Sequence, residues 1–160
     1  MTIAPGDRIP AAKLMTMTAD GMTDLSTEEL FAGKKVVLFA LPGAFTPTCS
    51  AKHLPGFVAS AAAIREKGVD TIACLSVNDA FVMGAWGEAQ GVGDDVLMLA
   101  DGNAEFTDAL GLGFDGSGFG MGKRAQRFAM VADDGVVTSL MLEEPGAFEV
   151  SSAESVLAAL

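Results

Sequence analysis

The sequence predicts an α/β fold in which a mixed central sheet carries helices on both faces. Two short apolar runs, Val36–Leu41 and Val69–Val77, are bounded by Pro42-Gly43 and Gly68 and have the character of strands buried on both faces. Between them, an alanine-rich segment from about Pro47 to Lys67 has helical composition. The order strand, helix, strand predicts a right-handed βαβ unit with parallel strands. Pro55-Gly56 should kink or break the helix.

Weaker patterns predict the other elements, and the turn Asp133-Asp134-Gly135 predicts an antiparallel hairpin. The elements are a short helix opened by Ser26–Glu29 before Gly33, a helix over 80–90 capped by Asn78 or Asp79 and stopped by Gly91, a strand over 96–100, a short helix over 105–110, strands over 126–132 and 136–142, and a C-terminal helix opened by the capping box 151–154. We find no internal repeat and no linker, so residues 1–160 are expected to form one domain.

Composition excludes several classes of protein. Half of the residues are hydrophobic, which is enough for a sizeable core, and 10 Lys and Arg against 21 Asp and Glu give a net charge of -11. Such an acidic surface repels phosphate backbones and anionic lipid, so neither nucleic acid nor a membrane is an expected partner. The first ten residues lack a signal pattern, and no apolar stretch is long enough to span a bilayer. We therefore expect a cytoplasmic protein.

The glycine-rich segment 111–122 contains a formal G-x-G-x-x-G at Gly111, Gly113 and Gly116. That fingerprint binds nucleotides only where a strand precedes it and a helix opens within it. Here a predicted helix precedes it, so a mobile surface loop is the better interpretation. With a single histidine, a metal site built from several histidines is impossible, and no metal or other cofactor is expected.

The segment Pro42-Gly43-Ala44-Phe45-Thr46-Pro47-Thr48-Cys49 carries the chemistry. Thr46 is a good N-cap and Pro47 a favoured first helical residue, which places Cys49 third in the helix. Free N–H groups and the helix dipole stabilise an anion there, so this thiol should ionise more readily than a free one, whose pKa is about 8.5. Free cysteines are often inert core residues, but the junction of a buried strand with a helix favours a reactive thiolate.

Two kinds of cysteine chemistry fit poorly. A disulfide oxidoreductase would carry C-x-x-C, but Thr46 lies three residues before Cys49. A hydrolase needs a histidine that reaches the thiol from elsewhere in the fold, and the only one, His53, lies one turn along the same helix. We therefore expect His53 to hold local backbone rather than to act as a base.

Pro42, Thr46 and Cys49 form the P-x-x-x-T-x-x-C signature that resembles the peroxiredoxins, whose fold is thioredoxin-like. The longer string PGAFTPTCSAKHLPGF is similar to the type II, or atypical, subfamily, closest to its bacterial and plant glutaredoxin-linked members. The segments 68–86, 127–131 and 134–137 also match, and together they cover most of the chain after residue 30.

The resemblance implies a role for each matching residue. Cys49 corresponds to the peroxidatic cysteine, Thr46 to the hydroxyl that contacts peroxide and thiolate, Pro42 to the shield against solvent, and Arg127 to the distant arginine of the site. A guanidinium would stabilise the thiolate and hold the leaving oxygen as charge develops on it. The hydroxyl of Thr46 could accept an N–H bond while donating its hydrogen to a substrate oxygen. Without the resemblance, nothing distinguishes Arg127 from Arg124.

The resemblance further implies a thiol-dependent peroxidase for hydrogen peroxide and alkyl hydroperoxides, with antioxidant function. An external thiol, glutathione with glutaredoxin or thioredoxin, would reduce the sulfenic acid. A homodimer is expected, with Phe45, Phe81 and Trp86 as candidate contacts. Cys74 matches the second cysteine of plant-type members, but its place within a buried strand favours an inert thiol over a resolving one. The alternative is a non-catalytic redox sensor or chaperone-like partner with the same reactive cysteine.

Overall fold

The computed structural model describes all residues, 1–160, and has the α/β architecture that the sequence predicts. The main sheet has seven strands in the order β2-β1-β5-β4-β3-β8-β9, and β6 and β7 form a separate two-stranded sheet. The strands are β1 (Lys13–Thr18), β2 (Gly21–Ser26), β3 (Lys35–Ala40), β4 (Thr71–Ser76), β5 (Leu97–Ala100), β6 (Gly113–Asp115), β7 (Lys123–Ala125), β8 (Phe128–Asp133) and β9 (Val136–Leu142). The helices are α1 (Thr27–Phe31), α2 (Leu54–Glu66), α3 (Ala80–Ala89), α4 (Glu105–Leu110) and α5 (Ala153–Ala159), with a π-helical turn η1 (Cys49–His53) and a 3-10 turn η2 (Ser117–Phe119). No helix is long and apolar enough to cross a bilayer.

The middle of the sheet is the predicted parallel unit. β3 pairs in parallel with β4, where Phe39 lies opposite Cys74, and β4 pairs in parallel with β5. On the other side of β3, β8 runs antiparallel and continues into β9 through the predicted hairpin. Because β3 and β4 are parallel, their carboxyl ends meet at one edge of the sheet, where α/β folds commonly place their functional groups.

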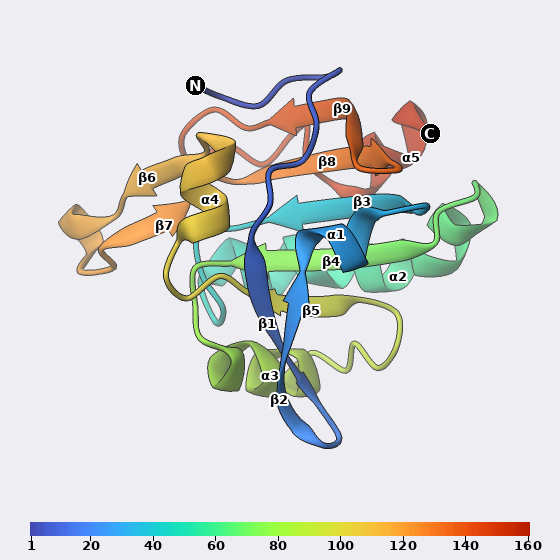
Figure 1. Cartoon of the computed structure of the whole chain (residues 1–160). Coiled ribbons are helices and arrows are strands. Elements are labelled where there is room, and N and C mark those ends of the chain that lie inside the picture. Colours follow the sequence, from blue (N-terminus) through green and yellow to red (C-terminus); the bar gives the residue numbers. More distant parts are fainter.

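Helices cover both faces of the sheet, as Figure 1 shows, with α1 and α4 in front and α2 behind. Alternation along β3 supplies both cores, since successive side chains of a strand point to opposite faces. Val37 and Phe39 pack with residues of α2, α3 and α5 in one buried cluster. Val36 and Leu38 pack with residues of α1 and α4 in the other.

The helix after β3 differs in form from the expectation. Helical geometry begins at Pro47 as predicted, but it widens into the π turn η1, in which the N–H of Leu54 donates to the carbonyl of Cys49. Pro55 then lies in the first turn of α2, and α2 continues through Gly56 without a break. The predicted interruption at Pro55-Gly56 is therefore wrong: the irregularity precedes Pro55, whose missing N–H is harmless in a first turn.

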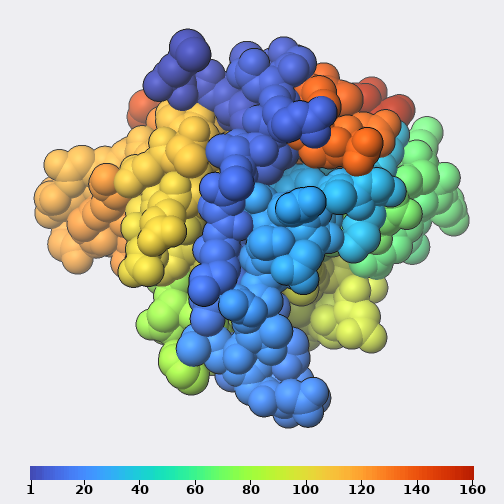
Figure 2. All heavy atoms as spheres, in the orientation of Figure 1, coloured from blue at the N-terminus to red at the C-terminus, as the bar shows by residue number.

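The glycine-rich segment lies largely exposed at the surface, as predicted, but part of it is a strand rather than a loop. β6 lies within it and pairs with β7, which directly follows it, and Gly111 ends α4 in a left-handed conformation with φ 72°. A Cβ on Gly111 would collide with the carbonyl of Met1, because the N-terminal segment crosses here and Ile3 donates to the carbonyl of Leu110. Figure 2 shows this blue segment running across the front of the molecule beside the yellow α4 region. Gly111 therefore serves chain packing.

Two further features differ from the sequence analysis. The hairpin of β1 and β2 was not anticipated, because β2 buries none of its side chains fully and so lacks a hydrophobic pattern. At the C-terminal helix, the N-cap is Ser152 rather than Ser151, with the side chain of Ser152 accepting from the N–H of Ser155. The predicted capping box at Ser26 and Glu29 is present in full.

Candidate active site

The loop after β3 carries Cys49 to the carboxyl edge of the sheet. Side chains at and just after the end of β4 hold this loop: Asn78 accepts from the N–H of Ala44 at 3.0 Å, and the hydroxyl of Ser76 donates to the carbonyl of Leu41. Phe45 adopts φ 64°, a left-handed conformation that costs a non-glycine residue about 1–2 kcal/mol. Such strain persists only where the surrounding bonds fix the backbone.

Cys49 and Arg127 meet at this edge. The sulfur is fully buried at the start of η1, and Nη2 of Arg127 donates to it at 3.2 Å. Arg127 directly precedes β8, the strand beside β3, so the sheet order brings it across from the helix. Arg124 donates to the carbonyls of Met121 and Pro42 and makes no hydrogen bond to the sulfur. The structure thus distinguishes the two arginines, which the residue pattern alone does not.

Thr46 and Pro42 are both half-buried, and both line a concavity together with Arg127. The hydroxyl of Thr46 donates to the carbonyl of Gly43 at 2.7 Å. Because a carbonyl can only accept, the single hydroxyl hydrogen of Thr46 is engaged there, and its oxygen can offer a ligand only lone pairs. In this geometry the predicted donation to substrate would require the hydroxyl to leave the Gly43 carbonyl.

His53 reaches farther than the sequence analysis expects. It is fully buried, its Nδ1 lies 2.9 Å from Nη1 of Arg127, and its Nε2 lies 2.9 Å from the carbonyl of Ser151. Burial, reinforced by the adjacent Arg127 charge, lowers the pKa of His53 to about 3. His53 is therefore neutral at physiological pH, and it bridges two distant segments in addition to its own turn.

Glu143, which directly follows β9, organises the segment that contains Ser151. Its buried carboxylate accepts hydrogen bonds from the N–H groups of Glu149, Val150 and Ser151 and from the hydroxyl of Ser151. Burial alone would raise the pKa of Glu143, but these bonds, led by those from Ser151, outweigh it and lower the pKa. The carboxylate therefore stays ionised and fixes the segment from 149 to 151.

Comparisons with known proteins agree with this geometry. A family model described as Redoxin matches residues 4–157. The chain belongs to the Redoxin family. The rice (Oryza sativa subsp. japonica) relative named Peroxiredoxin-2E-2, chloroplastic, is 58% identical over 99% of this chain and 73% of its own length. Peroxiredoxin-2B of Arabidopsis thaliana is 48% identical over 99% of this chain and 98% of its own.

A solved structure extends the likeness to three dimensions. Reduced Prx3 of Vibrio vulnificus, in complex with hydrogen peroxide, is 59% identical and covers 99% of both chains with a TM-score of 0.95. The protein is thus a type II peroxiredoxin with a thioredoxin-like fold, and its activity is that of a thiol peroxidase. The resemblance stated from the sequence is confirmed.

The second cysteine of this peroxiredoxin lies inside the core. Cys74 is fully buried in the middle of β4, and both cysteines are free thiols in the structure. Burial raises the pKa of Cys74 well above its usual value, the nearby Cys49 adds to the effect, and Arg127 opposes it. Cys74 is therefore a protonated, poorly nucleophilic thiol.

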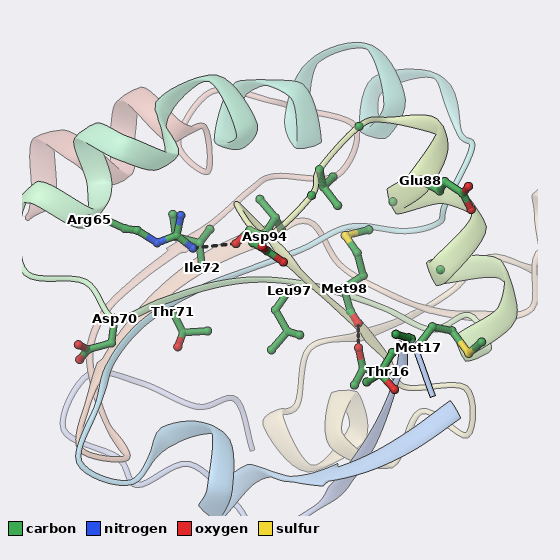
Figure 3. A pocket seen from close by; sticks show the side chains of 18 residues that line it. Thr16, Met17, Arg65, Asp70, Thr71, Ile72, Glu88, Asp94, Leu97 and Met98 are labelled. Carbon is green, nitrogen blue, oxygen red and sulfur yellow. Dashed lines mark hydrogen bonds between the residues drawn. The ribbon is translucent and has the colours of Figure 1, made fainter. Parts of the chain in front are cut away.

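Two concavities of similar size differ in chemistry. One, of about 890 Å³, lies over the site and is lined by Pro42, Thr46 and Arg127 together with the apolar side chains of Phe114, Phe119, Met121, Pro47 and Pro145. The other, of about 930 Å³, lies at the far end of α2, where Arg65 reaches in and donates to the backbone carbonyls of Asp94 and Asp95. Figure 3 shows Arg65 and its bond to Asp94. The second concavity is lined by none of the predicted site residues, whereas Pro42, Thr46 and Arg127 all line the first. No cluster of three or more acidic, Cys or His side chains in the molecule could hold a metal.

Sequence reasoning missed two residues of this peroxiredoxin site. Glu143 carries no local pattern, because it binds backbone amides of a segment six to eight residues on. His53 was noted, but its contact with Arg127 spans 74 residues and depends on the order of strands in the sheet. No spacing of residues along the sequence indicates either the contacts of Glu143 or the contact of His53 with Arg127.

Proposed function

We propose that Cys49 is the peroxidatic nucleophile and that Arg127 is its electrostatic partner. The observation that carries the proposal is the 3.2 Å hydrogen bond from Nη2 of Arg127 to the sulfur. The thiolate attacks the terminal oxygen of a hydroperoxide, an S–O bond forms and the O–O bond breaks. The alkoxide or hydroxide that leaves takes up a proton to give alcohol or water, and Cys49 becomes a sulfenic acid. Arg127, a permanent cation, stabilises the thiolate first and the leaving oxygen next.

Thr46 orients the hydroperoxide through its oxygen. Since its hydrogen is donated to Gly43, the Oγ1 atom accepts the O–H of the incoming hydroperoxide and turns the terminal oxygen toward the sulfur. Pro42, half-buried beside the site, limits access of water to the thiolate. Thr46 and Pro42 thus act by positioning and shielding the reactants, and neither residue changes its own charge.

The concavity over Cys49 favours organic hydroperoxides as well as hydrogen peroxide. The lining is mainly apolar, with Phe114, Phe119, Met121 and three prolines, and its polar side chains include Thr46 and Arg127. A mainly apolar concavity with polar groups that fix orientation is the usual form of a site for a partly apolar small molecule. The substrate class is therefore hydrogen peroxide and small alkyl hydroperoxides.

The electrons come from an external thiol, with no bound cofactor. A glutathione thiolate attacks the sulfenic sulfur of Cys49, water leaves, and a glutaredoxin then reduces the mixed disulfide. The complete burial of Cys74 within β4 supports an external reductant, because a residue fixed in a core strand is poorly placed to move into disulfide geometry with Cys49. Thioredoxin is the alternative donor.

A coupled assay tests the proposal. Peroxide-dependent oxidation of NADPH is measured with glutathione, glutaredoxin and their reductase, and separately with thioredoxin and its reductase. We expect many turnovers with the first system and none above background for Cys49→Ser in either. Turnover only with thioredoxin would show that thioredoxin, not glutathione with glutaredoxin, is the reductant. A single turnover with every thiol would show that the protein is a redox sensor instead.

We further propose that two copies of this chain pair through the rim of the site. Large aromatic side chains are exposed there: Phe45 is 58% and Phe119 81% exposed. Phe45 directly precedes Thr46, and Phe119 lines the concavity over the sulfur. Phe81, 64% exposed at the start of α3, is a further contact, whereas Trp86 is fully buried and packs in the core. Exposed aromatic residues are enriched in the buried centres of protein interfaces.

A further inference from the structure

The two hydrogen bonds of the His53 ring leave only one protonation state. Nη1 of Arg127 can only donate, so Nδ1 of His53 must accept, and the carbonyl of Ser151 can only accept, so Nε2 must donate. A neutral ring with its proton on Nε2 meets both demands, and no other form does. The charged groups that face the ring are Arg127 and Glu143.

Aromatic rings enclose His53 and keep this geometry dry. Phe39, Phe57 and Phe148 lie with their ring centroids 5.0, 5.7 and 5.0 Å from the imidazole. Phe148 also lies beneath the guanidinium of Arg127, with 5.8 Å from Cζ to the ring centre. Phe148 belongs to the segment that the Glu143 carboxylate holds at its end, so that carboxylate fixes both the Ser151 carbonyl and the ring. Hydrogen bonds are stronger in such surroundings than in water.

The charge of Arg127 is left unneutralised by this arrangement. The ion pairs of the structure join Lys13 to Asp24, Arg65 to Asp95 and Lys123 to Asp108, and none involves Arg127. The nearest acidic group of the network, Glu143, directs its oxygens to backbone amides instead. A carboxylate in the place of His53 would hold the guanidinium equally well but would cancel part of its field at the Cys49 sulfur.

We propose that His53 is a positioning residue that fixes Arg127 over the Cys49 sulfur through a neutral acceptor, so that the full positive charge of the guanidinium acts on the thiolate and the leaving oxygen. This inference rests on the proposed role of Cys49. An arginine side chain has about 2 kcal/mol of rotamer entropy to lose, and the bond to His53 together with the Phe148 ring restricts it before peroxide arrives. The Ser151 carbonyl, held by Glu143, sets the ring's tautomer and orientation.

A matched pair of variants isolates the acceptor. In a Cys74→Ser background, His53→Asn places an oxygen where Nδ1 lies, whereas His53→Leu has nearly the same shape without it. Both lose the bond to Ser151 and most of the aromatic contact, so any difference between them reports the bond to Arg127. The rate constant for reaction with hydrogen peroxide and the titration of thiolate absorbance are measured for each, with urea unfolding as the control for stability.

We expect His53→Leu to slow the peroxide reaction at least about tenfold relative to His53→Asn, the loss of one hydrogen bond to a charged group. The thiolate titration should move to higher pH in the leucine variant and return toward wild type in the asparagine variant. In an Arg127→Ala background the two variants should react equally fast, because the contact they differ in is gone. A purely structural role for His53 would give no such dependence on Arg127.

Three outcomes would overturn the inference: equal rates for His53→Asn and His53→Leu at similar stability, an undiminished difference in the Arg127→Ala background, or thiolate titrations that coincide. If His53→Leu does not fold, a loss of more than about tenfold in His53→Asn would overturn it as well. Failure of the proposed function can be told apart from failure of this inference, because peroxidase turnover would then survive in Cys49→Ser.

Discussion

The buried histidine makes the stability of the fold depend on pH between 7 and 5. Burial and the neighbouring Arg127 lower the pKa of His53 to about 3 in the folded chain, whereas an unfolded histidine has a pKa near 6.5. As the pH falls below 6.5, the unfolded chain binds a proton that the folded chain does not, so the free energy of unfolding decreases. Because proton binding is linked to unfolding, the free energy of unfolding should fall by about 2 kcal/mol from pH 7 to pH 5. This magnitude requires only that the folded pKa lie well below 5.

Urea unfolding at pH 7 and pH 5 measures this loss, with the fluorescence of Trp86, the only tryptophan, as the signal and both cysteines kept reduced. His53→Asn is the control, because it lacks the titrating ring and keeps every other ionisable group. We expect wild type to lose about 2 kcal/mol more than His53→Asn over this range. Equal losses in the two proteins would show that His53 takes up its proton equally in the folded and unfolded chains, and would refute a buried ring that stays neutral at pH 5.

Three further predictions follow from the site. Thr46→Val removes the oxygen that accepts from the hydroperoxide and keeps the shape, so stopped-flow fluorescence should show the peroxide step slowed about tenfold; an unchanged rate would remove Thr46 from the mechanism. Cys74→Ser should retain most turnover with glutathione and glutaredoxin, whereas its collapse, with a mapped Cys49–Cys74 disulfide in oxidised wild type, would establish a two-cysteine mechanism. Light scattering should report a dimer at micromolar concentration, and a monomer alone would contradict pairing at the exposed rim that includes Phe45.

Much of this architecture is encoded in local patterns that the sequence shows directly. The apolar runs that became β3 and β4 are buried on both faces, so their whole length is hydrophobic and easily recognised. Pro47 begins the helix as predicted, so counting along the sequence places Cys49 in its first turn. The predicted side-chain cap is absent, because the Thr46 hydroxyl donates to the carbonyl of Gly43 and accepts no N–H bond. The edge strand β2 escaped notice because it buries none of its residues fully.

The chemistry of the site depends on contacts that no local pattern contains. Arg127 reaches Cys49 across 78 residues because β8 adds to the sheet beside β3, and only a family resemblance selected it over Arg124. The role of His53 follows from two partners that lie 74 and 98 residues away. The π turn likewise could not be foreseen, because its sequence has an ordinary helical composition. Sheet order and long-range hydrogen bonds decide which of several polar residues become a site.

The central claim is that the Cys49 thiolate takes an oxygen atom from peroxide. Intact-mass and peptide analysis after one equivalent of hydrogen peroxide, without added thiol, tests it most directly. The account predicts the gain of a single oxygen mapped to Cys49, its conversion to a glutathione mixed disulfide at the same residue when glutathione is added, and neither product in Cys49→Ser. Oxygen mapped to Cys74 or to a methionine, with Cys49 unmodified, would contradict it.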